Sequence, residues 1–445
     1  MAGVRRHDVG YHDVISRLYS RYRKSAKGPI ARSVTFQVTN QCNLRCSYCY
    51  EHNKCDGSMS IYTAKKCVDA VLDMYEKNDP NMVISHDTKA IIFDFIGGEP
   101  LLEAKLMEEI IDYFMITAAR RGYTELIEFS RVSFATNGQL WFTPETQHLM
   151  EKYHEIISPS VSIDGIQELH DKYRIDQYGN GSFEKALKAF INIRDRYGVT
   201  GTKMTFTPGS TKYLSQSVKF MHDLGCVDIM CNYAFEPVYT ISDARDIYFE
   251  LKKLADILID IGDDTFVSIL DGEDTGEPSD NDNNWCGGTG KMLMFAPDGK
   301  CYPCLRYAPI SVGNKLAEKM CIGDCFNGIY NTERTIALKN ELEAITKTSQ
   351  SPEKCLTCPV AGGCAWCSGD NYEMYGTPNK RSTNICNAHK GRVLAICYYY
   401  NQRHLKLHDM PAKKIYLPYD ETVEFVGKEE ADNLFALEKE AFAKE

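Results

Sequence analysis

Short apolar runs alternate with amphipathic segments from residue 33 to about residue 262. Runs of this length, bounded by turn residues, predict buried parallel strands. They lie at Val34–Val38, Ala90–Ile96, Val132–Ala135, Ser160–Ile163, Lys203–Thr207 and Ile229–Ala234.

The segments between these runs carry apolar residues at helical spacing. One begins after Ser60 and places Ala64, Val68, Val71 and Tyr75 on one face. Five more lie at Leu106–Ile116, Pro144–His154, Phe183–Tyr197, Leu214–Leu224 and Ile247–Ile261. The alternation predicts an α/β fold, a partial (β/α)6 barrel. Such barrels place their chemistry at the carboxyl ends of the strands.

The same pattern divides the chain into five parts. Residues 1–32 form an N-terminal extension, and residues 33–270 form the barrel. Residues 271–285 are acidic and polar, which is typical of a linker. Residues 286–397 are rich in Cys and Gly with little periodicity, so we expect them to fold around metal. Residues 398–445 end in an acidic segment that predicts a helical tail.

Composition indicates where the protein is located in the cell and which classes of partner it does not bind. The 445 residues contain no apolar run long enough to span a bilayer, and the N-terminus lacks a signal peptide, so we expect a cytoplasmic protein without a membrane partner. The net charge of −10, without a basic block, argues against a nucleic-acid partner. The chain has 18 cysteines, and in a reducing compartment they indicate metal binding before disulfides.

The most specific motif follows the first predicted strand. Cys42, Cys46 and Cys49 stand in a C-x3-C-x2-C arrangement. Three thiolates can ligate three irons of a [4Fe–4S] cluster and leave the fourth open for a substrate or cofactor. The alternatives are a zinc knuckle or three unrelated thiols, but zinc sites usually show four ligands in paired spacings.

With an aromatic residue, Tyr48, before the last cysteine, this motif resembles the one in radical S-adenosylmethionine (SAM) enzymes. The resemblance implies that a reduced cluster splits SAM into methionine and a 5′-deoxyadenosyl radical. That radical would remove a hydrogen atom from an inert C–H bond. In this family the aromatic residue lies near the adenine, a role that the resemblance gives to Tyr48.

Two further groups of residues resemble the SAM site of the family. The loop Gly97-Gly98-Glu99-Pro100 resembles the GGEP loop that holds the amino group of SAM. By itself, such a loop is as often an ordinary turn. Polar residues at later strand ends are the other candidates for SAM binding: Thr136, Asn137, Ser162 and Arg174. The alternative for Arg174 is a surface ion pair, and the nearby Asp164 could merely cap a turn.

The run from Ser162 to Arg174 resembles the corresponding run in peptide-modifying members of this superfamily. The C-terminal cysteines resemble the SPASM domain of those enzymes, which carries two auxiliary [4Fe–4S] clusters. By this resemblance one cluster takes Cys355, Cys358, Cys364 and Cys386. The other takes Cys286, Cys304 and Cys367, with Cys301 as a candidate fourth ligand. The spacing Cys364-x2-Cys367 is one residue shorter than the family pattern. Two zinc ribbons are the alternative.

The remaining cysteines have simpler interpretations. Cys67, Cys226, Cys231 and Cys397 lie in apolar surroundings and are expected in the core. The pair Cys321 and Cys325 lies in an irregular segment, and ligation there is the less favoured interpretation.

The resemblance implies a radical SAM/SPASM enzyme that modifies a ribosomally made peptide. We expect SAM and three [4Fe–4S] clusters as cofactors. The expected partners are a Cys-containing precursor peptide and a reductant such as flavodoxin or ferredoxin. A thioether or C–C cross-link is the favoured product, and no catalytic base is assigned.

Three rivals remain at this stage. An anaerobic sulfatase maturase would make formylglycine, but that family has an Asp directly after the cysteine that matches Cys304, and here the residue is Leu305. Asp298 and Glu236 are candidate substitutes for it. The other rivals are a small-molecule dehydrogenase of the same fold and a non-catalytic iron–sulfur or zinc scaffold.

Overall fold

The computed structural model describes residues 30–79, 82–199, 201–262, 265–270 and 286–444. Most of the predicted N-terminal extension and all of the predicted linker therefore lie outside the described residues. A single sheet organises the described chain, with the strand order β11-β10-β9-β8-β1-β2-β3-β4-β5-β6-β7. The order β1 to β7 follows the sequence, and all of these neighbours pair in parallel.

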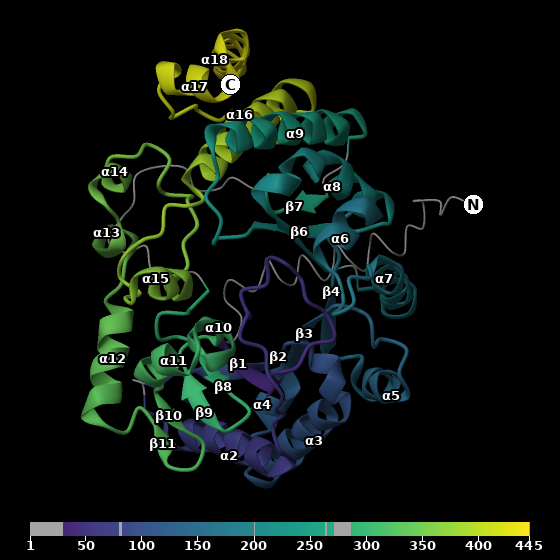
Figure 1. Cartoon of the computed structure of the whole chain (residues 1–445), viewed down its shortest axis with the longest axis vertical. Coiled ribbons are helices and arrows are strands. Elements are labelled where there is room, and N and C mark those ends of the chain that lie inside the picture. Colours follow the sequence, from purple (N-terminus) through teal and green to yellow (C-terminus); the bar gives the residue numbers. More distant parts are fainter. Residues whose placement is uncertain (1–29, 80–81, 200, 263–264, 271–285, 445) are drawn as a thin grey trace.

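The six predicted strands are confirmed, and β7 is a short addition at the edge. Their bounds are β1 (Ile30–Thr39), β2 (Thr88–Gly97), β3 (Arg131–Thr136), β4 (Ile157–Ser162), β5 (Thr202–Phe206), β6 (Asp228–Tyr233) and β7 (Phe266–Val267). The sheet curves into the predicted partial barrel, with helices around its outside (Figure 1).

The six predicted barrel helices also form. Their bounds are α2 (Ile61–Lys77), α3 (Ala104–Arg120), α5 (Pro144–Tyr153), α7 (Phe183–Tyr197), α8 (Leu214–Asp223) and α9 (Ile241–Asp260). The helix α9 begins six residues earlier than the apolar pattern suggests. The side chain of Thr240 accepts from Asp243 N, and the side chain of Asp243 accepts from Thr240 N, so a capping box sets the start. Shorter helices are α4 (Thr124–Phe129), α6 (Gln167–Tyr173), η2 (Pro100–Glu103) and η3 (Pro208–Tyr213).

The inner face of the barrel is more open than the sequence suggests. Side chains that point outward against the helices are buried, but the alternate positions in β3, β4 and β5 are partly or fully exposed. Ala135, Ser158 and Lys203 are among the exposed ones. These strands are therefore not buried on both faces, because the open barrel leaves its interior accessible.

The cysteine-rich region extends the same sheet beyond β1. Its strands are β8 (Leu293–Phe295), parallel to β1, then β9 (Lys300–Tyr302), β10 (Gly323–Asp324) and β11 (Gly328–Ile329), all antiparallel. Its helices are η4 (Leu305–Tyr307), α10 (Pro309–Val312), α11 (Asn314–Met320), α12 (Glu333–Glu343), α13 (Lys347–Gln350), α14 (Glu353–Leu356) and α15 (Ser368–Tyr375).

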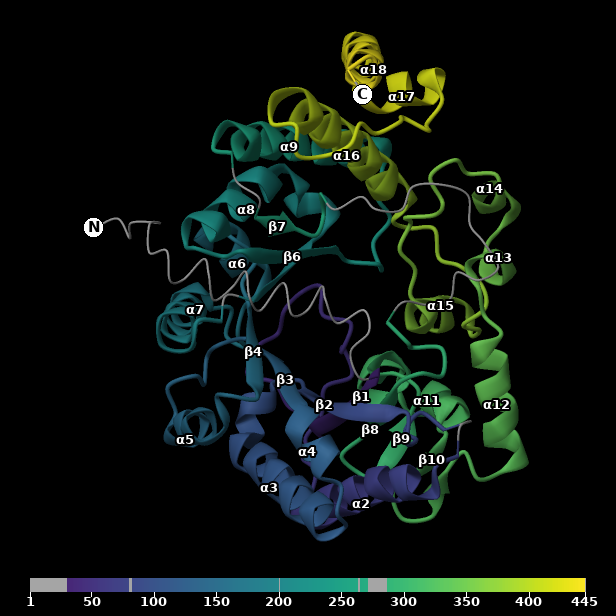
Figure 2. The ribbon, with the colours of Figure 1, turned by 180° about the vertical axis from the view of Figure 1, so that it is seen from behind.

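A long helix, α16 (Cys386–Lys406), joins this region to the tail. It lies against α9 at one end of the molecule (Figure 2). The predicted boundary between residues 397 and 398 falls inside α16. The tail itself is helical, as expected, with α17 (Tyr419–Val426) and α18 (Lys428–Phe442). Among the described residues, none of the helices is both long and apolar enough to cross a membrane.

Candidate active site

The motif cysteines lie in one loop at the carboxyl end of β1. Cys42, Cys46 and Cys49 are all half-buried. The backbone holds the loop in place, because Arg45 N donates to Ile175 O at 2.6 Å. Burial raises the pKa of Cys42 to about 12, and the charge of Cys46 adds to the effect. Neighbouring thiols that repel one another as anions are a ligand set that a cation would stabilise.

A lysine that sequence reasoning missed completes this loop. Lys54 Nζ lies 3.0 Å from Cys49 Sγ and also donates to Glu51 O. The contact places a cation beside one of the three predicted cluster ligands. Lys54 follows Cys49 by five residues, and this short separation is the only sequence signal that could have identified Lys54.

The glycine pair packs against the cysteine loop. A Cβ on Gly98 would collide with Gln41 O and lie 2.7 Å from Cys42 Cβ. The missing side chain therefore allows two protein loops to approach each other. Glu99 N donates to Gln41 O at 2.9 Å and strengthens the same contact.

Glu99 connects the ends of β2 and β3. Its carboxylate accepts from Thr136 Oγ1 at 2.6 Å, from Asn137 N at 2.8 Å and from Leu101 N at 3.1 Å. Burial raises the pKa of Glu99 to about 7, although these hydrogen bonds oppose the shift. Asn137 in turn donates to Asn43 Oδ1 at 2.7 Å. The structure thus brings the GGEP loop, the cysteine loop and the end of β3 together.

Arg174 forms a buried ion pair with Asp164 and not a surface one. Its Nε lies 2.8 Å from Asp164 Oδ2 and its Nη2 lies 3.1 Å from Oδ1. Tyr48 donates to the same carboxylate, and its ring centroid is 5.3 Å from the guanidinium. Asp164 also accepts from Thr205 N at 3.0 Å. Asp164 is therefore a hub of the site and more than a turn cap.

The C-terminal thiols fall into two predicted groups, and the thiols of each group lie within range of one another's charge, although among the described residues no three His, Cys, Asp or Glu side chains are close enough to hold a single metal ion. In the first, a Cβ on Gly288 would lie 3.5 Å from Cys286 Sγ and 3.6 Å from Cys304 Cβ. The charges of Cys286 and Cys367 both raise the pKa of Cys304, although burial is the largest cause. In the second, the pKa of Cys364 is raised first by burial and then by the charges of its three predicted partners, Cys386, Cys355 and Cys358.

Cys301 does not lie with the first of these groups. It is fully buried on β9, and the thiols that act on it are Cys321 and Cys325. It shares an apolar cluster with Cys67 and Cys325, whereas Cys304 packs against a second cluster. The structure thus separates Cys301 from the Cys286, Cys304 and Cys367 thiols. The core cysteines Cys67, Cys226, Cys231 and Cys397 are all buried, as predicted.

Tyr50 lies between the cysteine loop and the first C-terminal group. Burial raises the pKa of its phenol well above the ordinary value, and the charges acting on it include both Cys49 and Cys304. Two thiol groups that are more than 250 residues apart in the sequence therefore approach the same side chain. The sequence carries no signal of this contact.

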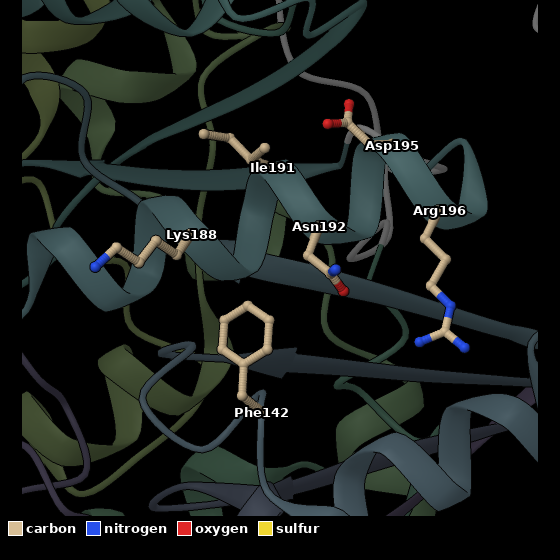
Figure 3. A pocket seen from close by; sticks show the side chains of 6 residues that line it. All are labelled: Phe142, Lys188, Ile191, Asn192, Asp195 and Arg196. Atoms are coloured by element: carbon tan, nitrogen blue, oxygen red, sulfur yellow. The ribbon is translucent and has the colours of Figure 1, made fainter.

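A surface pocket lies elsewhere, on the outside of the barrel (Figure 3). It is lined by Phe142, Lys188, Ile191, Asn192, Asp195 and Arg196. All but Phe142 belong to α7, and none is a candidate site residue.

Residues 36–220 match the sequence model of the radical SAM superfamily. The matched segment runs from β1 into α8 and is less than half of the chain. The chain is a radical SAM enzyme of the SPASM type, related to anaerobic sulfatase-maturating enzymes and to peptide maturases. The expectation from the cysteine motif is confirmed, as is the partial barrel with a cysteine-rich region.

Individual relatives are distant. An uncharacterized protein of Methanocaldococcus jannaschii is 29% identical over 44% of this chain and 61% of its own length. The radical SAM cyclopropyl synthase TigE of Paramaledivibacter caminithermalis is 20% identical over 83% of this chain and 75% of its own length. The structure of native anSMEcpe with bound AdoMet and a Kp18Cys peptide has a TM-score of 0.60 at 17% identity. It covers 85% of this chain and 99% of the other.

The described residues fit the cofactors of such enzymes, which are SAM and [4Fe–4S] clusters. Three half-exposed thiols share one loop, and Lys54 balances their charge. Arg174 is buried, and among the described residues its Nη1 has no hydrogen-bond partner. Arg174 Nη1 is not among the fully buried atoms that lack a partner, so solvent or an anionic group of a ligand can reach it.

Proposed function

We propose that this radical SAM enzyme modifies a ribosomally made peptide and that the product is a cross-link. The observation that carries the proposal is the position of Tyr50, which follows Cys49 directly in the chain and whose ring centroid lies 4.5 Å from the guanidinium carbon of Arg306, two residues after Cys304. A substrate held beside Tyr50 would be within reach of both groups. The Kp18Cys peptide bound to anSMEcpe, a protein of similar fold, supports a peptide as the substrate.

The proposed ligands are those of the two C-terminal groups and of the cysteine loop. Cys42, Cys46 and Cys49 would hold the first cluster, and the residues Tyr48, Gly97, Gly98, Glu99, Pro100, Thr136, Asn137, Ser162 and Arg174 would surround SAM. When bound, these groups supply a radical that removes a hydrogen atom from an inert C–H bond. Arg174 would orient SAM through its free Nη1, and the exposed inner face near Lys203 would admit the peptide.

The position of Cys301 favours a role for a substrate cysteine. Without Cys301, the group of Cys286, Cys304 and Cys367 offers three thiols for a cluster of four irons. One corner then lacks a ligand from the described residues, and a cysteine side chain of the peptide could coordinate there. This is the reason to prefer a Cys-containing peptide and a thioether over a C–C bond.

Formylglycine formation is the second candidate, because anaerobic sulfatase-maturating enzymes are among the relatives. Against it stands Leu305, which cannot accept a proton where that family has an Asp. The two candidates predict different products. A cross-link removes two hydrogen atoms from a peptide and consumes a thiol if it is a thioether, whereas formylglycine replaces the Cys or Ser side chain by an aldehyde.

Mass spectrometry tests the proposal. Short Cys-containing reading frames beside this gene supply the candidate peptides, which are incubated with anaerobically reconstituted enzyme, SAM and a flavodoxin or ferredoxin system. We expect a peptide that has lost two hydrogen atoms, together with 5′-deoxyadenosine. The variant Cys42→Ala/Cys46→Ala/Cys49→Ala is the control and should yield neither. An aldehyde product would establish the second candidate, and absence of 5′-deoxyadenosine would leave only a scaffold.

A further inference from the structure

A buried arginine lies beside Tyr50 and beside the group of Cys286, Cys304 and Cys367. Arg306 follows Cys304 by two residues and is 9% exposed. Its guanidinium carbon lies 4.5 Å from the centroid of the Tyr50 ring. Burying a cation without a compensating charge is costly. The groups that surround Arg306 should therefore indicate its role.

Two carboxylates accompany this cation. Arg306 Nη2 donates to Glu236, which follows β6, and Nη1 lies 3.5 Å from Asp370 Oδ1 on α15. Asp370 is 1% exposed, while the side chain of Glu236 is 36% exposed. Arg306 thereby connects the barrel, the loop after Cys304 and the helix after Cys367.

The stem of Arg306 runs directly along the segment that carries Cys367. A Cβ on Gly369 would collide with Arg306 Cβ and lie 3.2 Å from its Cδ. The next residue, Asp370, donates its backbone N–H to Cys367 Sγ at 3.5 Å. Among the charges that act on Arg306, Cys367 comes first, ahead of Glu236. The guanidinium is therefore a fixed positive charge beside two thiols of one group.

We infer that Arg306 raises the reduction potential of the iron–sulfur cluster proposed on Cys286, Cys304 and Cys367, with Glu236 as the counter-charge that limits the rise. Reduction adds one negative charge to a cluster, and a buried cation stabilises that charge more strongly than an exposed one. The inference rests on the proposed function only in that these three cysteines hold a cluster.

The two side chains predict shifts of opposite sign, which makes the inference testable. The full chain carrying Cys42→Ala/Cys46→Ala/Cys49→Ala is reconstituted anaerobically, so that only the auxiliary clusters contribute to the signal. Electron paramagnetic resonance is then followed during a redox titration. We expect Arg306→Gln to lower one midpoint potential, Glu236→Gln to raise the same one, and Arg306→Lys to leave it near the parent value.

The cluster proposed on Cys355, Cys358, Cys364 and Cys386 is the internal control, and its midpoint should not move. Unchanged midpoints in Arg306→Gln and Glu236→Gln at full iron content would overturn the inference, as would shifts of the same sign. If Arg306→Gln does not fold, Glu236→Gln decides, because its side chain is partly exposed and an upward shift is still required. Replacing Cys286, Cys304 and Cys367 by Ala separates the two proposals: iron content that does not fall overturns the cluster assignment itself.

Discussion

At the scale of single residues, Gly98 shows how one missing side chain supports the site. Its backbone approaches Gln41 and Cys42 so closely that any Cβ would force the cysteine loop to move. We expect Gly98→Val to lose the iron of the first cluster as well as SAM binding, because the ligand loop is displaced. Iron analysis and equilibrium dialysis with SAM would check this. A folded variant with full iron content and parental SAM affinity would contradict the packing argument.

His170 makes the stability of this region depend on pH. Its Nδ1 accepts from Asp164 N at 3.4 Å, and its Nε2 lies 2.9 Å from Ser182 Oγ. Burial lowers the pKa of His170 to about 4, so the folded protein holds it neutral while the unfolded chain takes up a proton below about pH 6.5. The stabilisation is therefore complete above that pH and is lost as the pH falls towards 4.

Between pH 7 and pH 5 this single group should lower the free energy of unfolding by about 2 kcal/mol. Denaturant titrations of the protein and of His170→Gln at both pH values measure it. The variant should be less stable at pH 7 but lose less stability on acidification. Parallel losses in the two proteins would show that His170 is already protonated in the folded state.

Single site residues could be predicted from the sequence where they belong to a recognisable motif. The GGEP residues, Thr136 and Asn137 were found because strand ends place them at one edge of the sheet. Arg306 and the role of Asp164 were not, because partners such as Glu236 and Tyr48 come from distant parts of the chain. Residue spacing does not encode such contacts.

At the scale of elements, the contact between α9 and α16 joins the barrel to the cysteine-rich region. A Cβ on Gly391 of α16 would collide with Ala244 O of α9. Replacing Gly by Ala favours a helix by about 1 kcal/mol in an exposed position. Overpacking a close contact costs about 1–3 kcal/mol, and a helix carbonyl cannot rotate away, so the cost should exceed the gain.

Gly391→Ala should therefore lower the melting temperature, and it should reduce the iron bound by the group that includes Cys386, the first residue of α16. Lys406→Gln, on the exposed end of the same helix, is the matched control and should change neither. Thermal unfolding and iron analysis provide the two measurements. A more stable Gly391→Ala protein would mean that the helices separate easily here.

Elements were predictable where one periodicity held over a whole segment. The six strands and six helices of the barrel follow from their apolar spacing. The largest error in a boundary is the start of α9, because Thr240 and Asp243 cap it beyond the apolar stripe. The helix α16 was not predicted, because it begins at a cysteine and carries buried polar residues such as Asn401 and Arg403. Its apolar pattern is interrupted where it packs on several elements.

At the scale of the whole molecule, the number of clusters is the central prediction. The described chain holds the thiols of the cysteine loop and of the two C-terminal groups near one another within each set, so reconstituted protein should hold about three [4Fe–4S] clusters. Each group has its own charge environment: Lys54 for the first, Arg306 for the second and Arg381 for the third. Replacing Cys42, Cys46 and Cys49 by Ala should remove one cluster and abolish SAM cleavage. Unchanged iron content in that variant would refute the assignment.

Cys301 decides whether the second cluster is closed by the described chain or open to the substrate. Sequence spacing alone favours ligation, since Cys301 and Cys304 are close neighbours. The strand β9 overrides that proximity, because Cys301 turns towards Cys325 and the barrel cluster while Cys304 packs against the other apolar cluster.

We therefore expect Cys301→Ala to keep full iron content and the parental spectrum without peptide, with a cost in stability of about 1 kcal/mol for the buried thiol. Adding a Cys-containing substrate should then change the spectrum of the second cluster in both proteins. A spectral change in Cys301→Ala before any peptide is added would mean that Cys301 is a ligand and that the substrate thiol needs another site.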